Sequence, residues 1–305
     1  MIEKAQSYMV ANGLSQNALA KLAGINSSYL SSMIEGNWTA HPAGNNKTTV
    51  ISDKWFEQLA ETIGYKIEKE FWPVVPTPQF RQIIAAMQDA KYSSQSRMII
   101  GETGSGKTFT IQKFVRQNPQ YTYVVTANAL HTIKDLINEL CSVLRVEEKR
   151  SKAANLKAIA EKLTNIRKNG GRPVIIFDEA ENLKQAALAM LKSLYDAVGR
   201  NAGIVLIGTD QLVEKLDRLR RRNKEGMPQF HRRFKAGIRI LPEVDRTYRV
   251  FLDERIEDKG LRKLLATMCD NYGELNDYLE PALREADRQG KVLTEDLFRI
   301  IMNIN

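Results

Sequence analysis

Residues 97–108 read RMIIGETGSGKT, a short apolar run that leads straight into a glycine-rich loop. The loop has the spacing G-x-x-x-x-G-K-[ST], and residues 109–117, FTIQKFVRQ, continue it as a helical pattern. Gly101, Gly104 and Gly106 let the chain curl so that backbone amides point at bound phosphates, where the helix dipole adds positive potential. The stretch therefore predicts strand, phosphate loop and helix, the start of an α/β nucleotide-binding domain.

A second apolar run, residues 173–177 (PVIIF), ends in Asp178 and Glu179. Ligands of α/β sheets bind where strands end, so we expect Asp178 to hold Mg²⁺ directly or through water. Glu179 is then the expected general base for the attacking water. On their own, two acids at a helix N-terminus would be an equally good interpretation, and the phosphate loop favours the catalytic one.

ATP and Mg²⁺ are the expected cofactors of this site. Lys107 would neutralise charge on the β- and γ-phosphates, and Thr108 would share Mg²⁺ with Asp178. The residues expected to contact the nucleotide are Gly101, Thr103, Gly104, Ser105, Gly106, Lys107, Thr108, Phe109 and Asp178.

Two further segments supply candidate catalytic groups. A third apolar run, residues 203–207, ends in Gly208 and Thr209, whose hydroxyl could hold the lytic water or contact the γ-phosphate. Spacing alone leaves it equally open that Thr209 caps the next helix. In residues 228–234, PQFHRRF, either Arg232 or Arg233 could reach a neighbouring subunit's nucleotide, or both could contact DNA or solvent.

The first 70 residues form a different region, with six Lys and Arg against seven Asp and Glu. Residues 16–36, QNALAKLAGINSSYLSSMIEG, have two apolar helical faces joined by a turn at Gly24, a helix-turn-helix pattern. Its second helix offers Ser28 and Tyr29 to DNA but no Arg or Lys, so we expect a weak reader. A bundle used for protein contacts is the alternative. Residues 72–78, WPVVPTP, predict an extended linker.

Composition narrows the class of protein. A length of 305 residues fits about two domains, and 43% hydrophobic residues can fill a core in each. No apolar run approaches the ~20 residues of a membrane span, and the N-terminus lacks a secretory pattern. We therefore expect a cytoplasmic protein with no membrane partner. Cys141 and Cys269 lie in apolar patterns and are expected to be reduced, buried thiols.

Positive charge gathers in the second part of the chain. Residues 71–305 carry 39 basic against 29 acidic residues, and residues 216–224, LDRLRRRNK, are the densest run. Such runs attract the phosphate backbone of DNA, although a charge run can also be a solvated face. The residues expected to contact DNA in this part are Lys134, Lys149, Arg150, Lys152, Arg218, Arg220, Arg221 and Arg222.

The order of these motifs resembles the AAA+ ATPases. With the leading helix-turn-helix pattern, the chain resembles the Mu B family of DNA-transposition ATPases. The resemblance implies a five-stranded parallel sheet with a helical lid, and subunits that assemble as a ring or helical filament on double-stranded DNA. It matches Lys107 and Thr108 to Walker A, Asp178 and Glu179 to Walker B, and Thr209 to sensor 1.

The resemblance also assigns residues nearer the C-terminus. Arg233 matches the arginine finger, with Arg232 as a close competitor, and Asn276 stands where many relatives have the sensor 2 arginine. The implied domains are a small all-α domain at 1–70, a linker at 71–79, the AAA+ core at 80–242 and a helical lid at 243–305. Four amphipathic segments fit the lid: 243–257, 261–272, 274–288 and 294–303.

The leading functional hypothesis is a slow, DNA-stimulated ATPase that binds DNA with little sequence preference, selects target DNA and activates a DDE-type transposase. A replication initiator or helicase loader would share the fold, but such proteins usually carry their winged-helix domain after the lid. The third hypothesis is an ATP-responsive transcriptional regulator with a sequence-specific helix-turn-helix, which the lack of Arg and Lys in residues 27–35 disfavours.

Overall fold

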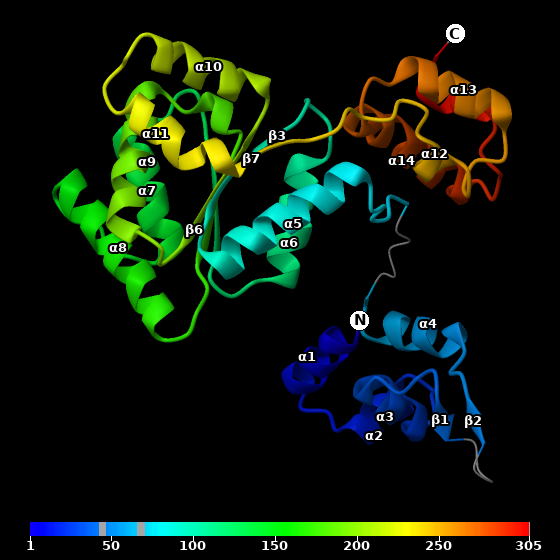
Figure 1. Ribbon diagram of the computed structural model, residues 1–305. Helices are drawn as coiled ribbons and strands as arrows, with labels where there is room; N and C mark the ends of the chain where they lie inside the picture. The colour runs from blue at the N-terminus through cyan, green and yellow to red at the C-terminus, as the bar shows by residue number, and fades with distance from the viewer. Residues whose placement is uncertain (43–46, 66–70, 305) are drawn as a thin grey trace. The chain divides into compact units, whose positions relative to one another are not determined.

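The computed structural model describes residues 1–42, 47–65 and 71–304, and the chain divides into two compact units, Met1–Phe71 and Trp72–Asn305. Figure 1 shows both units, which are described separately here. No helix among the described residues is both long and apolar enough to cross a membrane. The elements of the first unit are α1 (Ile2–Asn12), α2 (Gln16–Leu22), α3 (Ser27–Glu35), β1 (His41–Pro42), β2 (Thr48–Thr49) and α4 (Asp53–Thr62).

The first unit is a small helical bundle. Side chains cap the helices locally: Ser15 accepts from the Ala18 amide at the start of α2, and Asn26 accepts from the Ser28 amide at the start of α3. Its core holds fully buried Leu19, Leu30, Met33 and Leu59 together with other apolar residues. The helical N-terminal region expected from the sequence is confirmed. The structure adds a hairpin, β1–β2, in which His41 pairs with Thr49.

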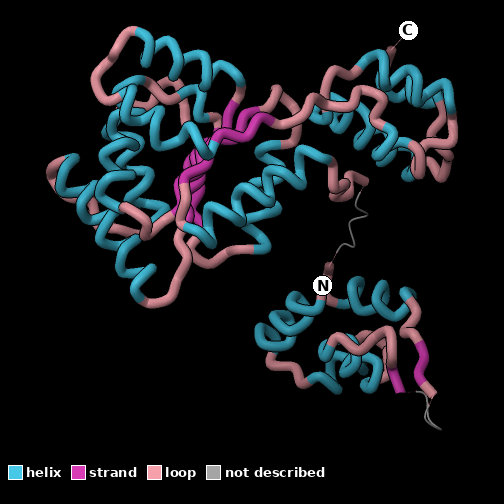
Figure 2. Tube along the Cα trace, viewed as in Figure 1, coloured by secondary structure: helices cyan, strands magenta, loops and turns pink. Residues whose placement is uncertain are grey.

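The second unit contains a five-stranded parallel sheet in the order β4-β5-β6-β3-β7, as expected from the sequence. In Figure 2 the strands lie between two groups of helices. The core elements are α5 (Pro78–Ser93), β3 (Ser96–Ile100), α6 (Lys107–Gln117), β4 (Thr122–Thr126), α7 (Ile133–Leu144), α8 (Lys152–Lys168), β5 (Val174–Asp178), α9 (Gln185–Val198), β6 (Gly203–Gly208), α10 (Asp210–Arg221), α11 (Met227–Phe234) and β7 (Ile238–Ile240).

Alternating strand side chains fill two separate layers of the core. Met98 and Ile100 of β3 face the apolar cluster that includes α7 to α11, whereas Ile99 faces α5 and α6. Figure 1 shows these two groups of helices on opposite faces of the sheet. Because the sheet is covered on both sides, its central strands β5 and β6 are almost entirely apolar and buried, which is why the sequence revealed them.

The lid follows the sheet and has its own apolar core. It comprises α12 (Arg249–Leu252), α13 (Lys259–Met268), α14 (Tyr272–Arg288) and α15 (Glu295–Met302). The first amphipathic segment, 243–257, is mostly not helical. Asp245 accepts bonds from the amide and hydroxyl of Thr247, and Tyr248 adopts a left-handed φ of 50°, which together form a turn instead.

The segment expected as a linker, 71–79, lies largely within the second unit. Trp72 and Val75 pack against the lid core, and the Trp72 ring stacks on Phe251 with centroids 5.0 Å apart. Helix α5 begins at Pro78, where Thr77 accepts from the Phe80 amide at 3.1 Å. Near the other end of the core, residues 235–237 form a 3-10 turn, so β7 begins only at Ile238.

Candidate nucleotide-binding site

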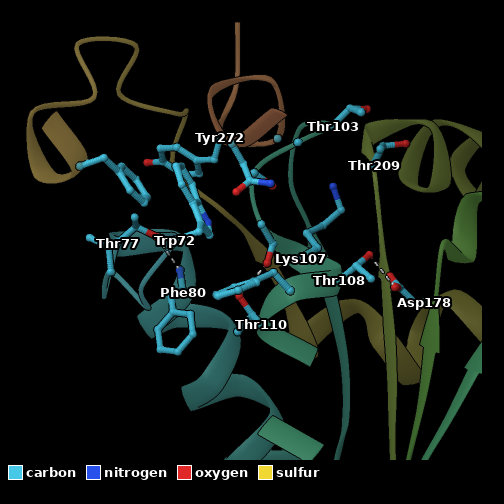
Figure 3. Close-up of a pocket in the computed structure, with 18 of the residues that line it drawn as sticks. Trp72, Thr77, Phe80, Thr103, Lys107, Thr108, Thr110, Asp178, Thr209 and Tyr272 are labelled. Carbon is cyan, nitrogen blue, oxygen red and sulfur yellow. Dashed lines mark hydrogen bonds between the residues drawn. The ribbon is translucent and has the colours of Figure 1, made fainter. Parts of the chain in front are cut away.

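A cavity of about 350 Å³ lies beyond the carboxyl ends of the central strands. Its lining comes from the phosphate loop, from the residues that follow β5 and β6, and from the lid together with the segment that begins at Trp72. In Figure 3, Trp72 and Tyr272 lie on one side of Lys107, and Asp178 and Thr209 on the other. The cavity thus has an aromatic end and a polar end.

The phosphate loop adopts the curled backbone that its glycines predict. Gly104 and Gly106 have φ of 72° and 84°, and α6 starts immediately at Lys107. The Lys107 Nζ donates to the carbonyls of Gly101 at 2.9 Å and Glu102 at 2.7 Å. Burial lowers the pKa of Lys107, although Glu181 and other carboxylates oppose this shift. All the predicted nucleotide contacts except Gly101 line the cavity.

Thr108 and Asp178 form the polar pair expected for a magnesium site. The Thr108 hydroxyl donates to Asp178 Oδ2 at 2.8 Å, and Asp178 is only 4% exposed at the end of β5. Hydroxyl and carboxylate oxygens are ligands that Mg²⁺ prefers, and in phosphate sites Mg²⁺ takes few protein ligands because phosphates and water complete its shell. Within the described ranges no group of three or more His, Cys, Asp or Glu forms a metal cage. The pair fits Mg²⁺ bound with a nucleotide.

Two hydroxyl oxygens in the cavity wall are buried without a partner among the described residues. Ser105 Oγ and Thr209 Oγ1 make no hydrogen bond within the part of the chain that the structure describes. Thr209 precedes α10, but its side chain does not cap that helix. A buried hydroxyl left unpaired costs free energy, so both are suited to a polar ligand. The capping alternative for Thr209 is therefore not what the structure has.

Two acidic side chains lie beyond β5. Glu179 is exposed, lines the cavity and accepts from Asn182 Nδ2 at 3.1 Å. Glu181, which the sequence analysis did not single out, also lines the cavity and accepts from the Thr209 amide at 3.3 Å. Its position two residues after Glu179, in a short turn of residues 180–182, could have drawn attention to it. The site therefore offers three carboxylates, with Asp178 as the third.

The aromatic end of the cavity was also missed by sequence reasoning. Trp72, Phe80, Phe251 and Tyr272 line it, and the Tyr272 hydroxyl donates to Gln79 at 3.2 Å. Flat apolar rings of this kind can stack on a planar heterocycle. No local pattern could reveal this wall, because its members are far apart in the sequence and only the fold brings them together.

The lid touches the phosphate loop directly. The Gly273 amide donates to the Gly104 carbonyl at 3.3 Å, and a Cβ on Gly104 would lie 2.0 Å from Asn271 Oδ1. Glu102 of the loop pairs with Arg246 at 2.9 Å, just after β7. Asn276, at the expected sensor 2 position, lines the cavity with a buried and unpartnered Oδ1 in the described structure.

The two candidate finger arginines differ sharply in their surroundings. Arg233 forms an ion pair with Asp196, donates to the Gln229 carbonyl at 3.0 Å and lies over the Tyr195 ring. Arg232 is exposed, and no ion pair or hydrogen bond of its side chain is found among the described residues. Neither lines the cavity of its own chain.

The expected DNA contacts of the second unit are exposed, and they fall in two places. Arg218, Arg220 and Arg221 form the last turn of α10, followed by Arg222. Lys134 lies in the first turn of α7, and the others lie between α7 and the start of α8: Lys149, Arg150 and Lys152. Lys215, which immediately precedes the basic run 216–224, is instead turned inward onto backbone carbonyls.

The expected DNA contacts of the first unit lie on α3 and already have partners. Ser28 donates to Asn26 at 3.0 Å, and the Tyr29 ring packs edge-on against His41 at 4.7 Å. On the same helix, Ser32 is buried and bonds to His41 at 2.8 Å. The polar side chains of α3 are thus largely used within the unit.

Comparison with known proteins agrees with this architecture. Residues 90–216 match the model of an AAA domain. The chain is 24% identical over 218 residues to the Mu-like prophage FluMu DNA transposition protein B of Haemophilus influenzae, covering 71% of each chain. It is 21% identical over 199 residues to the ATP-dependent target DNA activator B of Escherichia phage Mu, covering 65% of this chain and 60% of that protein.

Solved structures share the fold at low sequence identity. The Cdc6p protein of Pyrobaculum aerophilum aligns with a TM-score of 0.54 and 16% identity, over 79% of this chain and 67% of that one. The ORC2 protein of Aeropyrum pernix aligns with a TM-score of 0.51 and 19% identity, over 74% of this chain and 66% of that one. With its phosphate loop, parallel sheet and these relatives, the chain contains an AAA domain and resembles the phage Mu B transposition protein.

Proposed function

We propose that the chain binds ATP with Mg²⁺ in the cavity, assembles on double-stranded DNA as a ring or helical filament, selects target DNA and activates a DDE-type transposase. The observation that carries the nucleotide site is the Thr108–Asp178 hydrogen bond beside Lys107. The name of the phage Mu relative, an ATP-dependent target DNA activator, supports the wider role. The place of action is the cytoplasm of a bacterial or phage-infected cell.

In this proposal the polar end of the cavity holds the triphosphate and the aromatic end holds the base. Lys107 leaves its two carbonyl partners for the β- and γ-phosphates, and the amides of the loop donate to phosphate oxygens. Thr108 and Asp178 hold Mg²⁺, which neutralises charge on the phosphates when bound. Thr209 donates its free hydroxyl to the γ-phosphate or to the attacking water.

Hydrolysis follows from the placement of Glu179. Its carboxylate takes a proton from the water while the water oxygen forms a bond to the γ-phosphorus. The bond from the γ-phosphorus to the β–γ bridging oxygen breaks, and ADP leaves with that oxygen. Asn182, which donates to Glu179, orients the carboxylate toward the water.

Arg232 is the better candidate for the arginine finger. A finger must extend to the nucleotide of a neighbouring subunit to stabilise the transition state. Arg233 would first have to leave Asp196 and Tyr195, whereas Arg232 is exposed and has no such bonds to break among the described residues. Arg233 then holds α11 against α9.

The basic end of α10 and the basic segment between α7 and α8 are the proposed DNA surface. Their exposed cations suit contact with phosphates, which gives affinity without reading sequence. The first unit, whose α3 has few free polar groups, is proposed as a weak DNA reader or a protein-contact module. Asn276 cannot supply the charge of a sensor 2 arginine, so slow turnover is part of the proposal.

The first test measures the mass of the protein by light scattering with several unrelated duplexes, with and without ATP, alongside ATP hydrolysis. The proposal expects large ATP-dependent assemblies on any duplex and hydrolysis that DNA stimulates. A small oligomer of constant mass bound to a single sequence would reject it in favour of the transcriptional regulator.

A further inference from the structure

Helix α10 connects two regions of the second unit that are otherwise separate. Its N-terminal side begins after Thr209, whose unpartnered hydroxyl lies in the cavity wall. Its C-terminal turn carries Arg218, Arg220 and Arg221. The helix has twelve residues, and at a rise of about 1.5 Å per residue its two ends are roughly 18 Å apart.

Hydrogen bonds hold a short turn after β5 against α10. This turn, η1, spans Ala180–Asn182. Glu181 accepts from the Thr209 amide through its side chain, while its own carbonyl accepts from Lys215 of α10. Lys215 also donates to the Leu183 carbonyl at 3.3 Å. Two hydrogen bonds from donors on and just before α10 thus meet at one residue, Glu181, which accepts both; we call this pair of contacts the clamp.

The clamp leaves little room for adjustment at the strand end. A Cβ on Gly208 would lie 2.5 Å from Glu181 Oε2, so the carboxylate fits closely against the backbone just before Thr209. Leu212 and Leu216 are buried and hold α10 against the core. Because these groups are tightly packed, a displacement of Lys215 also displaces the backbone that carries Thr209.

The positive charge at the end of α10 also affects the pKa of Lys215. Its amine is partly desolvated, and Arg218, one turn away, further lowers the pKa of Lys215 by like-charge repulsion. A DNA phosphate on Arg218 would offset that repulsion and strengthen the bonds from Lys215 to the Glu181 and Leu183 carbonyls. DNA binding is therefore expected to hold the turn 180–182 more firmly against α10.

We propose that Lys215 and Glu181 are positioning residues that couple DNA on the end of α10 to the placement of Thr209 in the nucleotide site. The inference rests on the proposed DNA-binding function and deepens it, because it names how DNA stimulates hydrolysis. Lys215 contributes through the turn at Glu181 and makes no contact with DNA itself.

The test is a steady-state ATPase assay of the full chain with and without a saturating mixed-sequence duplex. Lys215→Met removes the amine and keeps most of the apolar stem. We expect Kd for a non-hydrolysable ATP analogue and Kd for the duplex to stay within about twofold, while the DNA-stimulated increase in kcat falls at least about fivefold, the lower range of allosteric coupling. Lys215→Arg, which keeps a cation, restores most of the stimulation.

Two control variants separate coupling from other effects. Lys162→Met removes an exposed lysine from α8 and leaves all parameters unchanged. Arg220→Met weakens duplex binding but keeps the stimulation once DNA is saturating. If Lys215→Met keeps the full stimulation, the inference is overturned and the proposed function stands. If the parent protein shows no stimulation by DNA, the proposed function falls and the inference with it.

Hydrogen exchange on the unmodified protein gives a measurement that does not depend on how Lys215→Met folds. With the ATP analogue present, adding duplex should slow amide exchange in residues 180–183 and 209–212 as well as in 218–224. Protection confined to 218–224 would show that DNA occupancy stops at the basic turn, and the coupling would be rejected.

Discussion

The amine of Lys107 is the only lysine or arginine group lining the cavity within the described residues. Lys107→Ala should weaken ATP binding by roughly tenfold to a hundredfold, since a hydrogen bond to a charged group contributes about 1.5–3 kcal/mol. ATP-dependent assembly on DNA should be lost with it. A fluorescent ATP analogue measures the affinity, with Lys162→Ala as the matched surface control. Unchanged affinity would remove Lys107 from the site.

Loss of the negative charge at Glu179 should slow hydrolysis without weakening ATP or DNA binding. Glu179→Gln should slow hydrolysis by about 10²–10⁴-fold, because the general base is lost, while ATP and DNA remain bound for longer. Single-turnover hydrolysis and DNA dissociation measure the two effects, with Glu161→Gln on α8 as the control. Hydrolysis at the parental rate in Glu179→Gln would show that another group takes the proton.

Substitution of the two arginines of α11 should have different effects, one on the stability of the fold and the other on hydrolysis. Arg233→Ala should lower the free energy of unfolding by about 1–2 kcal/mol, a modest value because the pair with Asp196 is partly exposed. Arg232→Ala should leave the melting temperature unchanged and abolish hydrolysis in assemblies. Mixing Arg232→Ala with Lys107→Ala chains should restore part of the activity, since each supplies what the other lacks. No recovery on mixing would argue against a finger acting between subunits.

At the scale of elements, the phosphate loop and the start of α14 lie so close together that there is no room for a side chain at position 104. Gly104→Ala should weaken nucleotide binding, because the new methyl group collides with Asn271 and the φ of 72° is strained for alanine. Adding Asn271→Ser, which can still cap α14, should recover part of the loss. Calorimetric titration with ADP measures both. If the double variant binds no better than Gly104→Ala, backbone strain alone accounts for the effect.

The elements that the sequence predicted best are those with a strong local signal. The strands β3, β5 and β6 are buried apolar runs, and the loop before α6 has fixed glycine spacing. The hairpin β1–β2 escaped notice because each strand has two residues and carries no apolar alternation. The lid segment 243–257 has the apolar residues of a helix, but the Asp245–Thr247 turn competes with helix formation.

At the scale of the whole molecule, sequence reasoning found the polar half of the site and missed the apolar half. Lys107, Thr108 and Asp178 belong to motifs with known chemistry. Trp72 and Phe251 meet only because the chain passes through the entire sheet between them. The same holds for Arg233 and Asp196, which pair across 37 positions and leave Arg232 as the exposed arginine of α11.

The basic surface should give DNA binding that depends steeply on salt. Arg220→Ala combined with Arg221→Ala should reduce the slope of log Kd against log salt concentration by about 2, since each removes about one phosphate contact. Lys157→Ala combined with Lys162→Ala removes equal charge from α8 and should leave the slope unchanged. Fluorescence anisotropy over a salt series measures both. Equal slopes in the two double variants would place the DNA surface elsewhere.

The stacking of Trp72 on Phe251 gives the cavity an optical reporter of its own. Of the three tryptophans in the chain, Trp38 and Trp55 belong to the first unit, and Trp72 alone belongs to the second. Replacing the first two with phenylalanine would leave one indole, placed in the wall of the cavity. Its emission would then change as a nucleotide enters and leaves, so occupancy could be followed in real time without a labelled ligand.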